Sequence, residues 1–328
     1  MFMDIIYKKE LSMKKIGIKI SALLLSVSVL LIGCSSGVGN QAKKDDGKLS
    51  VYTSFYPMYD FAQKIGGDKV SIKNLISAGT EPHDWEPTPK DLVNIADSDV
   101  FIYSGAGMEA WIDKVSENVK NDKMEIVEAS KGVKLLDSKE EDSEETGKND
   151  EHKHGKYDPH VWLDPENAKI QMKNIKDAFV KADPKNKDFY EKNYEENMLK
   201  LDSLNQKFKD EIGKTKKKDI IVAHEAFGYL CKAYGINQIG IEGLSPDSEP
   251  DAARMAEISK FAKENNVKYI FFEELVSSKV SETIAREVSA KTEVLNPLEG
   301  LTDKQINDGE DYYSIMEKNL NSLLKALN

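Results

Sequence analysis

The sequence predicts an α/β protein of two similar lobes, each a four-stranded, mostly parallel sheet covered by helices, joined by one long rigid helix. Short β-branched or aromatic runs alternate with amphipathic helical patterns, which is typical of parallel sheets. These runs form two groups of four, separated by one uninterrupted helical pattern. The 328-residue chain is long enough for two domains, and 40% apolar with 31% charged residues is typical of a soluble globular protein.

Eight strands are expected, four in each half of the chain. Those of the first half are 49–53, 70–76, 100–103 and 125–127, and those of the second are 220–223, 238–241, 269–272 and 293–295. Two of the intervening helices have clear starts. Thr88 before Pro89, and Asp164 before Pro165, each combine an N-capping side chain with a proline at the first helical position.

A single long helix is expected over residues 185–213. Apolar residues recur there at steps of three or four from Tyr190 to Ile212, which is close to the helical period. At 1.5 Å per residue this helix is roughly 40 Å long. Such a helix exceeds one lobe and is expected to brace both, with residues 49–184 as the N-terminal lobe and 214–328 as the C-terminal lobe. A long surface helix of a single domain fits the same pattern.

The N-terminal segment is typical of an export signal. Lysines precede an apolar run that is too short to span a bilayer, and Leu31-Ile32-Gly33-Cys34 resembles a bacterial lipobox. Residues 1–33 are therefore expected to be a signal peptide, with Met1 or Met13 as its start, and Cys34 to carry a lipid. An ordinary signal peptide with a chance cysteine is the alternative. The polar residues 34–48 are expected to form a flexible tether.

Charge and cysteine content narrow the classes of function. The chain carries a net charge of −11, and removing residues 1–33, with their five lysines and two acids, leaves about −14. So acidic an exported protein is a poor candidate for binding nucleic acid and a reasonable one for attracting cations. With Cys34 lipidated, Cys231 has no partner. The fold must then rest on its apolar core without an intramolecular disulfide.

One acidic segment, residues 137–157, is expected to form an exposed, mobile loop. It is rich in glutamate and aspartate, and nothing apolar within it could anchor a fold. His152 and His154 add imidazoles to this carboxylate-rich strip. The loop is therefore a candidate metal-collecting arm, with a solvated loop of no specific role as the alternative.

Four residues are candidate metal ligands: His83, His160, His224 and Glu299, in a chain with only five histidines. His83, His224 and Glu299 each follow a predicted strand, and sites in open parallel sheets lie beyond the carboxyl ends of strands. His160 lies just before the helix that begins at Asp164. Each residue alone is a weak signal, because such histidines are more often ordinary surface or core residues. Together, three imidazoles and a carboxylate, two from each lobe, form the closed tetrahedral shell that Zn²⁺ prefers.

The chain resembles the metal-binding lipoproteins of ABC importers, in the cluster that carries zinc or manganese. The resemblance extends from about residue 49 to residue 328. The motifs that carry it are Glu-Pro-His83-Asp-Trp-Glu-Pro-Thr-Pro, Asp-Pro-His160-Val-Trp-Leu-Asp-Pro, His224-Glu-Ala-Phe-Gly-Tyr-Leu, Gly243-Leu-Ser-Pro-Asp-Ser-Glu-Pro and Asn296-Pro-Leu-Glu299.

The resemblance implies a function as well as a fold. It implies two α/β lobes with the metal between them, and an extracytoplasmic, lipid-anchored monomer that delivers its cargo to an ABC permease. It places the metal ligands on His83, His160, His224 and Glu299. Manganese binders of this cluster tend to carry a carboxylate at the third position, so His224 implies Zn(II) as cargo. A manganese-binding member of the same cluster is the alternative, although Mn²⁺ prefers more oxygen ligands than this set offers.

Two other classes of function compete with zinc capture. A zinc held by three histidines with an open position would activate water, as in a hydrolase, but His-Glu-x-x-His is absent and only Glu225 offers itself as a base. A surface adhesin with structural zinc is the second alternative. Glu273 or Glu274 could also replace Glu299 as the fourth ligand. The Pro-Leu-Glu-Gly context of Glu299 predicts a mobile loop, and hence a ligand that docking on the permease pulls away.

Overall fold

The computed structural model describes residues 47–138, 156–246 and 250–328. Several predictions concern segments that lie outside these residues: the signal peptide (1–33), the lipidated Cys34, nearly all of the tether (34–48), and most of the acidic loop (137–157) with His152 and His154. None of the helices formed by the described residues combines the length and the apolar character needed to cross a membrane.

The N-terminal sheet has four parallel strands in the order β2-β1-β3-β4. The strands are β1 (Leu49–Thr53), β2 (Val70–Asn74), β3 (Val100–Tyr103) and β4 (Glu125–Glu128). Its covering helices are α2 (Tyr56–Gly66) and α5 (Pro165–Ala182) on one face and α3 (Pro89–Ala96) and α4 (Ile112–Asn118) on the other. Successive strand residues alternate between these faces, so Val51 packs on the α2 and α5 side and Tyr52 on the α3 and α4 side.

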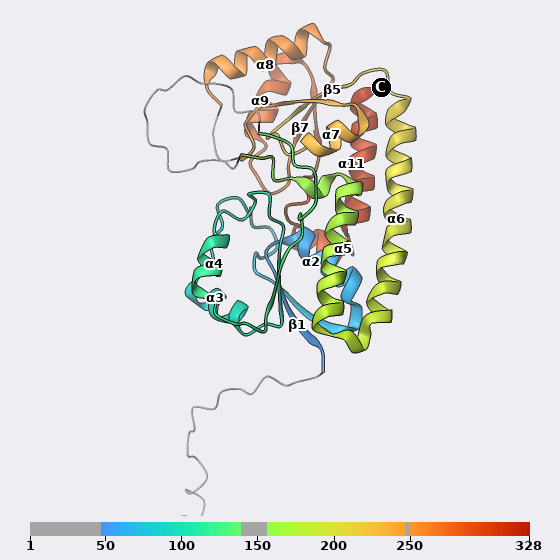
Figure 1. Cartoon of the computed structure of the whole chain (residues 1–328). Coiled ribbons are helices and arrows are strands. Elements are labelled where there is room, and N and C mark those ends of the chain that lie inside the picture. Colours follow the sequence, from blue (N-terminus) through green and yellow to red (C-terminus); the bar gives the residue numbers. More distant parts are fainter. Residues whose placement is uncertain (1–46, 139–155, 247–249) are drawn as a thin grey trace, which may run out of the picture. The chain divides into compact units, whose positions relative to one another are not determined.

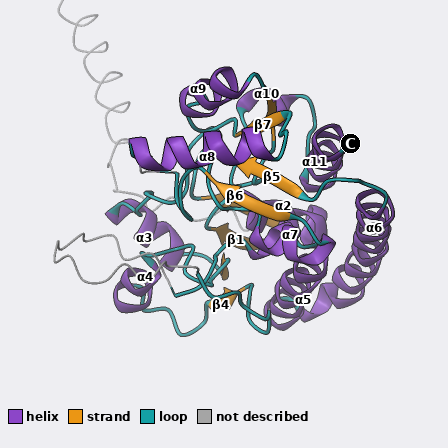
Figure 2. Ribbon diagram, turned by 90° about the horizontal axis from the view of Figure 1, so that it is seen from above, coloured by secondary structure: helices purple, strands orange, loops and turns teal. Residues whose placement is uncertain are grey.

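The C-terminal sheet repeats this arrangement with the parallel order β6-β5-β7-β8. The strands are β5 (Asp219–Val222), β6 (Asn237–Gly240), β7 (Tyr269–Phe272) and β8 (Lys291–Val294). The helices of this half are α7 (Gly228–Tyr234), α8 (Ala252–Glu264), α9 (Lys279–Val288), α10 (Asp303–Asn307) and α11 (Tyr312–Leu327). The view from above shows helices on both sides of the strands (Figure 2). The predicted fold class is confirmed, and each predicted strand is present to within two residues at either end.

Both predicted helix starts are present. The Thr88 hydroxyl accepts a hydrogen bond from the Asp91 N–H (3.3 Å), and the Asp91 carboxylate accepts one from the Thr88 N–H (2.9 Å), which completes a capping box. Asp164 accepts from the Glu166 N–H (2.9 Å) at the start of α5. The described residues also form three short 3₁₀ turns, at Gly67–Lys69, Val161–Leu163 and Pro184–Asn186.

One long helix, α6 (Lys187–Gly213), joins the two halves. Its 27 residues correspond to about 40 Å, and it begins two residues later than predicted because a 3₁₀ turn occupies Pro184–Asn186. α6 packs against α2 and α5 of the first half and against α7 and α11 of the second, and Figure 1 shows it running beside both. The bracing role expected from its length is thus visible in its contacts.

A single apolar core extends through both lobes. One cluster of buried residues includes Val51 and Phe61 from the first half, Phe208 from α6, and Val222 and Leu323 from the second half. Two smaller clusters fill the outer faces of the two sheets. The lobes are therefore not separate globules in contact, but share a continuous interior.

The contribution of α6 to this core can be measured with two substitutions. Phe208 is fully buried and stacks on Tyr234, with ring centroids 4.9 Å apart, whereas the Leu199 side chain on the same helix is 71% exposed. Phe208→Ala should lower the free energy of unfolding by about 3–5 kcal/mol. Leu199→Ala should change it by less than about 0.5 kcal/mol. Denaturant unfolding of the metal-free protein measures both, and equal effects would contradict the assigned packing of α6.

Candidate metal centre

Four side chains from distant parts of the sequence meet at one point. They are His83, His160, His224 and Glu299, whose ligand atoms all lie within 4.8 Å of one another. His83 lies in the loop after β2, His224 in the loop after β5 and Glu299 in the loop after β8, while His160 immediately precedes the Val161–Leu163 turn. The structure therefore brings together all four residues that the sequence selected.

The geometry of this group suits a tetrahedral ion. Glu299 Oε1 lies 3.2 Å from the Nε2 atom of His83, 3.0 Å from that of His160 and 3.3 Å from that of His224. The Nε2 atom of His160 lies 3.4 Å from the Nε2 atoms of the other two histidines. A zinc ion with ligands at 2.0–2.1 Å separates those ligands by about 3.3–3.4 Å. Five of the six distances within the group are thus close to the edges of a zinc tetrahedron, and the sixth, between His83 and His224, is at most 4.8 Å.

Burial of the four residues is uneven. The His160 and His224 side chains are fully buried, Glu299 is 2% exposed, and His83 is 11% exposed. The site is thus closed on three sides, with His83 as the ligand nearest to solvent.

Two further carboxylates orient the buried histidines. Asp158 Oδ1 lies 2.8 Å from His160 Nδ1, and Glu273 Oε1 lies 2.6 Å from His224 Nδ1. An ionised carboxylate can only accept, so each Nδ1 carries the proton and each Nε2 presents its lone pair to an ion when the ring is otherwise neutral.

Sequence reasoning did not assign these two positioning roles. Asp158 carries a local signal, because it stands two residues before His160. Glu273 directly follows β7, the neighbour of β5 in the sheet, and the strand order is needed to see that it faces His224. Neither Glu273 nor Glu274 belongs to the four-residue group. Glu273 supports His224, and Glu274 accepts a hydrogen bond from Asn296 (2.8 Å).

The loop that carries Glu299 differs from expectation. Its Pro-Leu-Glu-Gly sequence suggests mobility, yet residues 295–300 are all buried. Trp162, whose ring is tilted by 60° against that of His160, donates its indole N–H to the Pro297 carbonyl (2.8 Å) and so ties the loop to the first half of the chain. Tertiary contacts that local sequence does not encode hold this loop in place.

The four groups perturb one another's protonation. Burial lowers the pKa of His160, but its hydrogen bonds to Asp158 and Glu299 outweigh this effect and raise it. Burial also lowers the pKa of His224, which the charges of Glu273 and Glu299 nonetheless raise well above its usual value. Burial raises the pKa of Glu299, and the charges of His224 and His83 with two hydrogen bonds hold it well below its usual range. In the metal-free protein, protons supply the positive charge that this carboxylate requires.

Comparison with known proteins identifies the family. The ZnuA family, described as zinc-uptake complex component A, periplasmic, matches residues 51–326. The chain belongs to this family. The resemblance drawn from the motifs is thereby confirmed, and the ZnuA family is that of a component of a transport complex.

Curated ZnuA-family relatives match most of the chain. The high-affinity zinc uptake system protein ZnuA of Bacillus subtilis strain 168 is 47% identical over 299 residues, covering 91% of this chain and 93% of that protein. The zinc-binding lipoprotein AdcA of Streptococcus pneumoniae is 40% identical over 306 residues, covering 93% of this chain. The chain spans only 60% of the length of AdcA.

Solved structures of ZnuA-family proteins share the fold. The Zn(II)-bound ZnuA-like domain of Streptococcus pneumoniae AdcA matches with a TM-score of 0.74 and 39% identity, over 86% of this chain and 99% of that domain. The laminin-binding protein Lmb of Streptococcus agalactiae, described as bifunctional with adhesin and metal-transporting activity, matches with a TM-score of 0.75 and 33% identity. That match covers 85% of this chain and all of the Lmb chain.

The role of Glu273 can be tested without touching a candidate ligand. Glu273→Gln removes the charge that offsets the burial of His224, so the pKa of His224 should fall. Zinc affinity should weaken by roughly 10- to 100-fold, as is typical when a partner of a ligating histidine is lost. Histidine NMR titration of the metal-free protein and chelator competition measure the two effects. Glu225→Gln, beside His224 but partly exposed, is the matched control, and equal losses in both variants would contradict the assignment.

The metal-free protein should show a defined pH dependence of stability. The raised pKa values of His160 and His224 contribute stability that is fully present below about pH 6.5 and is lost as pH rises through their folded values. The lowered pKa of Glu299 contributes stability that is present above about pH 4.3 and is lost as pH falls through its folded value. Unfolding free energies of the metal-free protein should therefore decline above pH 6.5. Glu299→Gln should flatten that decline, and an unchanged slope would count against the coupling.

Proposed function

We propose that this protein captures Zn(II) outside the cytoplasmic membrane and delivers it to the permease of an ABC importer. The observation that carries the proposal is the convergence of His83, His160, His224 and Glu299, with five of their six mutual distances close to the edges of a zinc tetrahedron. The carboxylates of Asp158 and Glu273 behind two imidazoles support it further. Relatives of the same family are zinc-uptake proteins by name.

The proposal includes how the protein is organised and placed. Residues 1–33 are the signal peptide, Cys34 carries the lipid, and residues 34–48 form the tether to the extracytoplasmic face of the membrane. Residues 49–184 and 214–328 are the two lobes, and residues 185–213 link them in a monomer. His152 and His154 in the acidic loop are proposed to collect zinc for the main site.

Glu299 is proposed to be a retained ligand and not the one that leaves first. Its side chain is 2% exposed and its loop is buried, whereas His83 is 11% exposed in the loop between β2 and α3. Displacing His83 disturbs fewer buried contacts. The more exposed imidazole is thus the better candidate for the first ligand to open.

The site favours binding over catalysis. All four positions around a central ion are filled by protein atoms, which leaves no place for an activated water unless a ligand leaves. Glu225, the base that the sequence offered, is not a member of the four-residue group. The protein is therefore proposed to be a carrier and not a hydrolase.

Titration of the metal-free protein lacking residues 1–34 tests the function directly. We expect one tight zinc per chain, weaker manganese, and release of zinc to a chelator without unfolding. Calorimetry in buffers of different ionisation enthalpy should detect release of on the order of one proton per ion at pH 7, because the raised histidine pKa values leave protons to be displaced.

Other outcomes would favour the rival functions. Manganese binding as tight as zinc would assign the cargo to manganese. Zinc lost only on unfolding would indicate a structural ion and favour a surface adhesin, an activity ascribed to the relative Lmb. Glu299→Ala should abolish tight binding, and unchanged affinity in that variant would remove Glu299 from the ligand set.

A further inference from the structure

The residue before Glu299 has an unfavourable backbone conformation. Leu298 has φ +61°, in the left-handed region that residues with a side chain rarely adopt. Leu298 and Glu299 are nonetheless buried, and neither lies in a helix or strand. Such a turn persists only where its surroundings hold it. The contacts that hold it therefore also decide where the Glu299 carboxylate lies.

Asn319 of α11 holds the start of this loop. Its side-chain amide donates to the Asn296 carbonyl (2.7 Å), and its side-chain oxygen accepts from the Asn296 N–H (2.9 Å). Asn319 is 2% exposed, so no solvent competes for these bonds. One buried side chain thus pairs with both main-chain groups of Asn296, as a neighbouring strand would.

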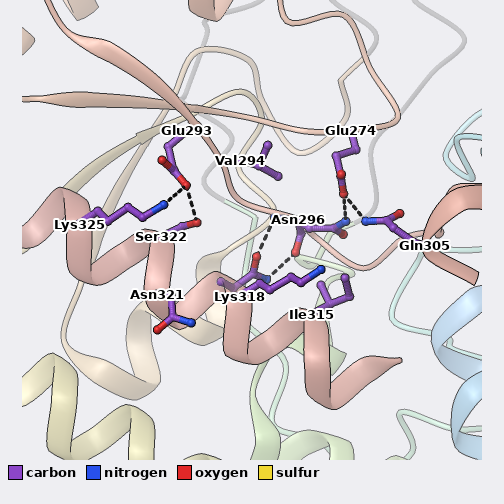
Figure 3. A pocket seen from close by; sticks show the side chains of 11 residues that line it. Glu274, Glu293, Val294, Asn296, Gln305, Ile315, Lys318, Asn321, Ser322 and Lys325 are labelled. Carbon is purple, nitrogen blue, oxygen red and sulfur yellow. Dashed lines mark hydrogen bonds and ion pairs between the residues drawn. The ribbon is translucent and has the colours of Figure 1, made fainter. Parts of the chain in front are cut away.

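Asn296 transmits this restraint to Leu298. Its side-chain oxygen accepts from the Leu298 N–H (2.7 Å), which closes a local turn over Pro297. Its side-chain amide donates to Glu274 Oε2 (2.8 Å), which also accepts from the Gln305 amide. Figure 3 shows Asn296 between Glu274 on one side and α11 on the other.

We propose that Asn319, Asn296 and Glu274, here called the loop clamp, are positioning residues that present Glu299 as a one-oxygen ligand and so favour zinc over manganese. The inference rests on the proposed function. Glu299 Oε1 faces all three Nε2 atoms at 3.0–3.3 Å, so a single carboxylate oxygen completes the shell. Mn²⁺ prefers more oxygen ligands and a larger coordination number. If the loop is loosened, the Glu299 carboxylate can rotate and offer both oxygens. Zinc affinity should then fall, while manganese affinity should change little.

The surroundings of the clamp supply matched controls. A cavity of about 270 Å³ beside it is lined by the clamp residues and also by Asn321 and Glu293. Asn321 is an exposed residue of α11, two positions from Asn319. Glu293 accepts from Ser322 and Lys325 of α11, and not from the loop. Each clamp residue to be substituted therefore has a control residue of the same type that lines the same cavity and makes no hydrogen bond to the described residues of the loop.

The experiment compares Asn319→Ala with Asn321→Ala, and Glu274→Ala with Glu293→Ala. Zinc and manganese affinities of each metal-stripped protein are measured by chelator competition and calorimetry, alone and with Glu299→Ala. Both clamp variants should bind zinc about 10-fold more weakly and manganese with little change, so the zinc-to-manganese preference falls. In the Glu299→Ala background the clamp variants should cause no further loss. The two control variants should match the parent protein.

Failure of the inference is distinguishable from failure of the proposed function. Clamp variants that bind zinc like their controls would overturn the inference, as would equal losses for zinc and manganese or an undiminished loss in the Glu299→Ala background. Glu299→Ala binding zinc like the parent would instead reject the ligand set of the proposed function. Glu274 is exposed, so Glu274→Ala should fold and can still test the inference if Asn319→Ala does not fold. Asn319→Asp, which retains the acceptor for the Asn296 N–H, should recover part of the zinc affinity.

Discussion

The buried charge of Glu299 is the constraint on which the rest of the site depends. A carboxylate taken out of water is costly unless positive charge and hydrogen bonds compensate it. Three imidazole nitrogens lie within 3.3 Å of one of its oxygens, and they supply that charge either as protonated rings or by sharing an ion. Asp158 and Glu273 stand behind two of those rings and stabilise their charged or metal-bound form. In the proposed function, the site exchanges protons for metal, with the same carboxylate balanced in both states.

The fold holds these groups in place because each lies on a loop that is anchored to a sheet or a helix. Both sheets have the same strand order. His224 follows β5 and Glu273 follows β7, and these two adjacent parallel strands are where the order of connection switches from one edge of the sheet to the other. α6 and the shared core fix one lobe against the other. Residues more than two hundred positions apart therefore meet to within hydrogen-bonding distance without a disulfide among the described residues.

The sequence predicts the features of this arrangement that depend on local residue patterns. β-Branched runs locate β1 to β8, and prolines after Thr88 and Asp164 locate two helix starts, because these are local properties. The candidate ligands were found because they are rare residue types at strand ends and lie in motifs of a known family. The role of Glu273 was not predicted because it depends on β5 and β7 being neighbours in the sheet, which the alternation of strands and helices along the chain does not determine. The role of Asn319 was not predicted because its partner Asn296 is 23 residues away. Its contact with Asn296, like that of Trp162 with Pro297, restrains a loop that local sequence predicted to be mobile.

The core that runs through both lobes has a consequence for the timing of ion exchange. Swinging the lobes apart would expose apolar surface along α6, at about 25 cal/mol for each Å², which favours smaller movements for the passage of an ion. The loop between β2 and α3, which carries His83, is the element at the solvent side of the site. If His83 is the first ligand to open, as proposed, the residence time of the ion depends on how often this loop opens, while the buried groups behind it contribute to binding strength. Under that proposal, substitutions in the surface loop would change the speed of capture, and substitutions among the buried groups would change its strength.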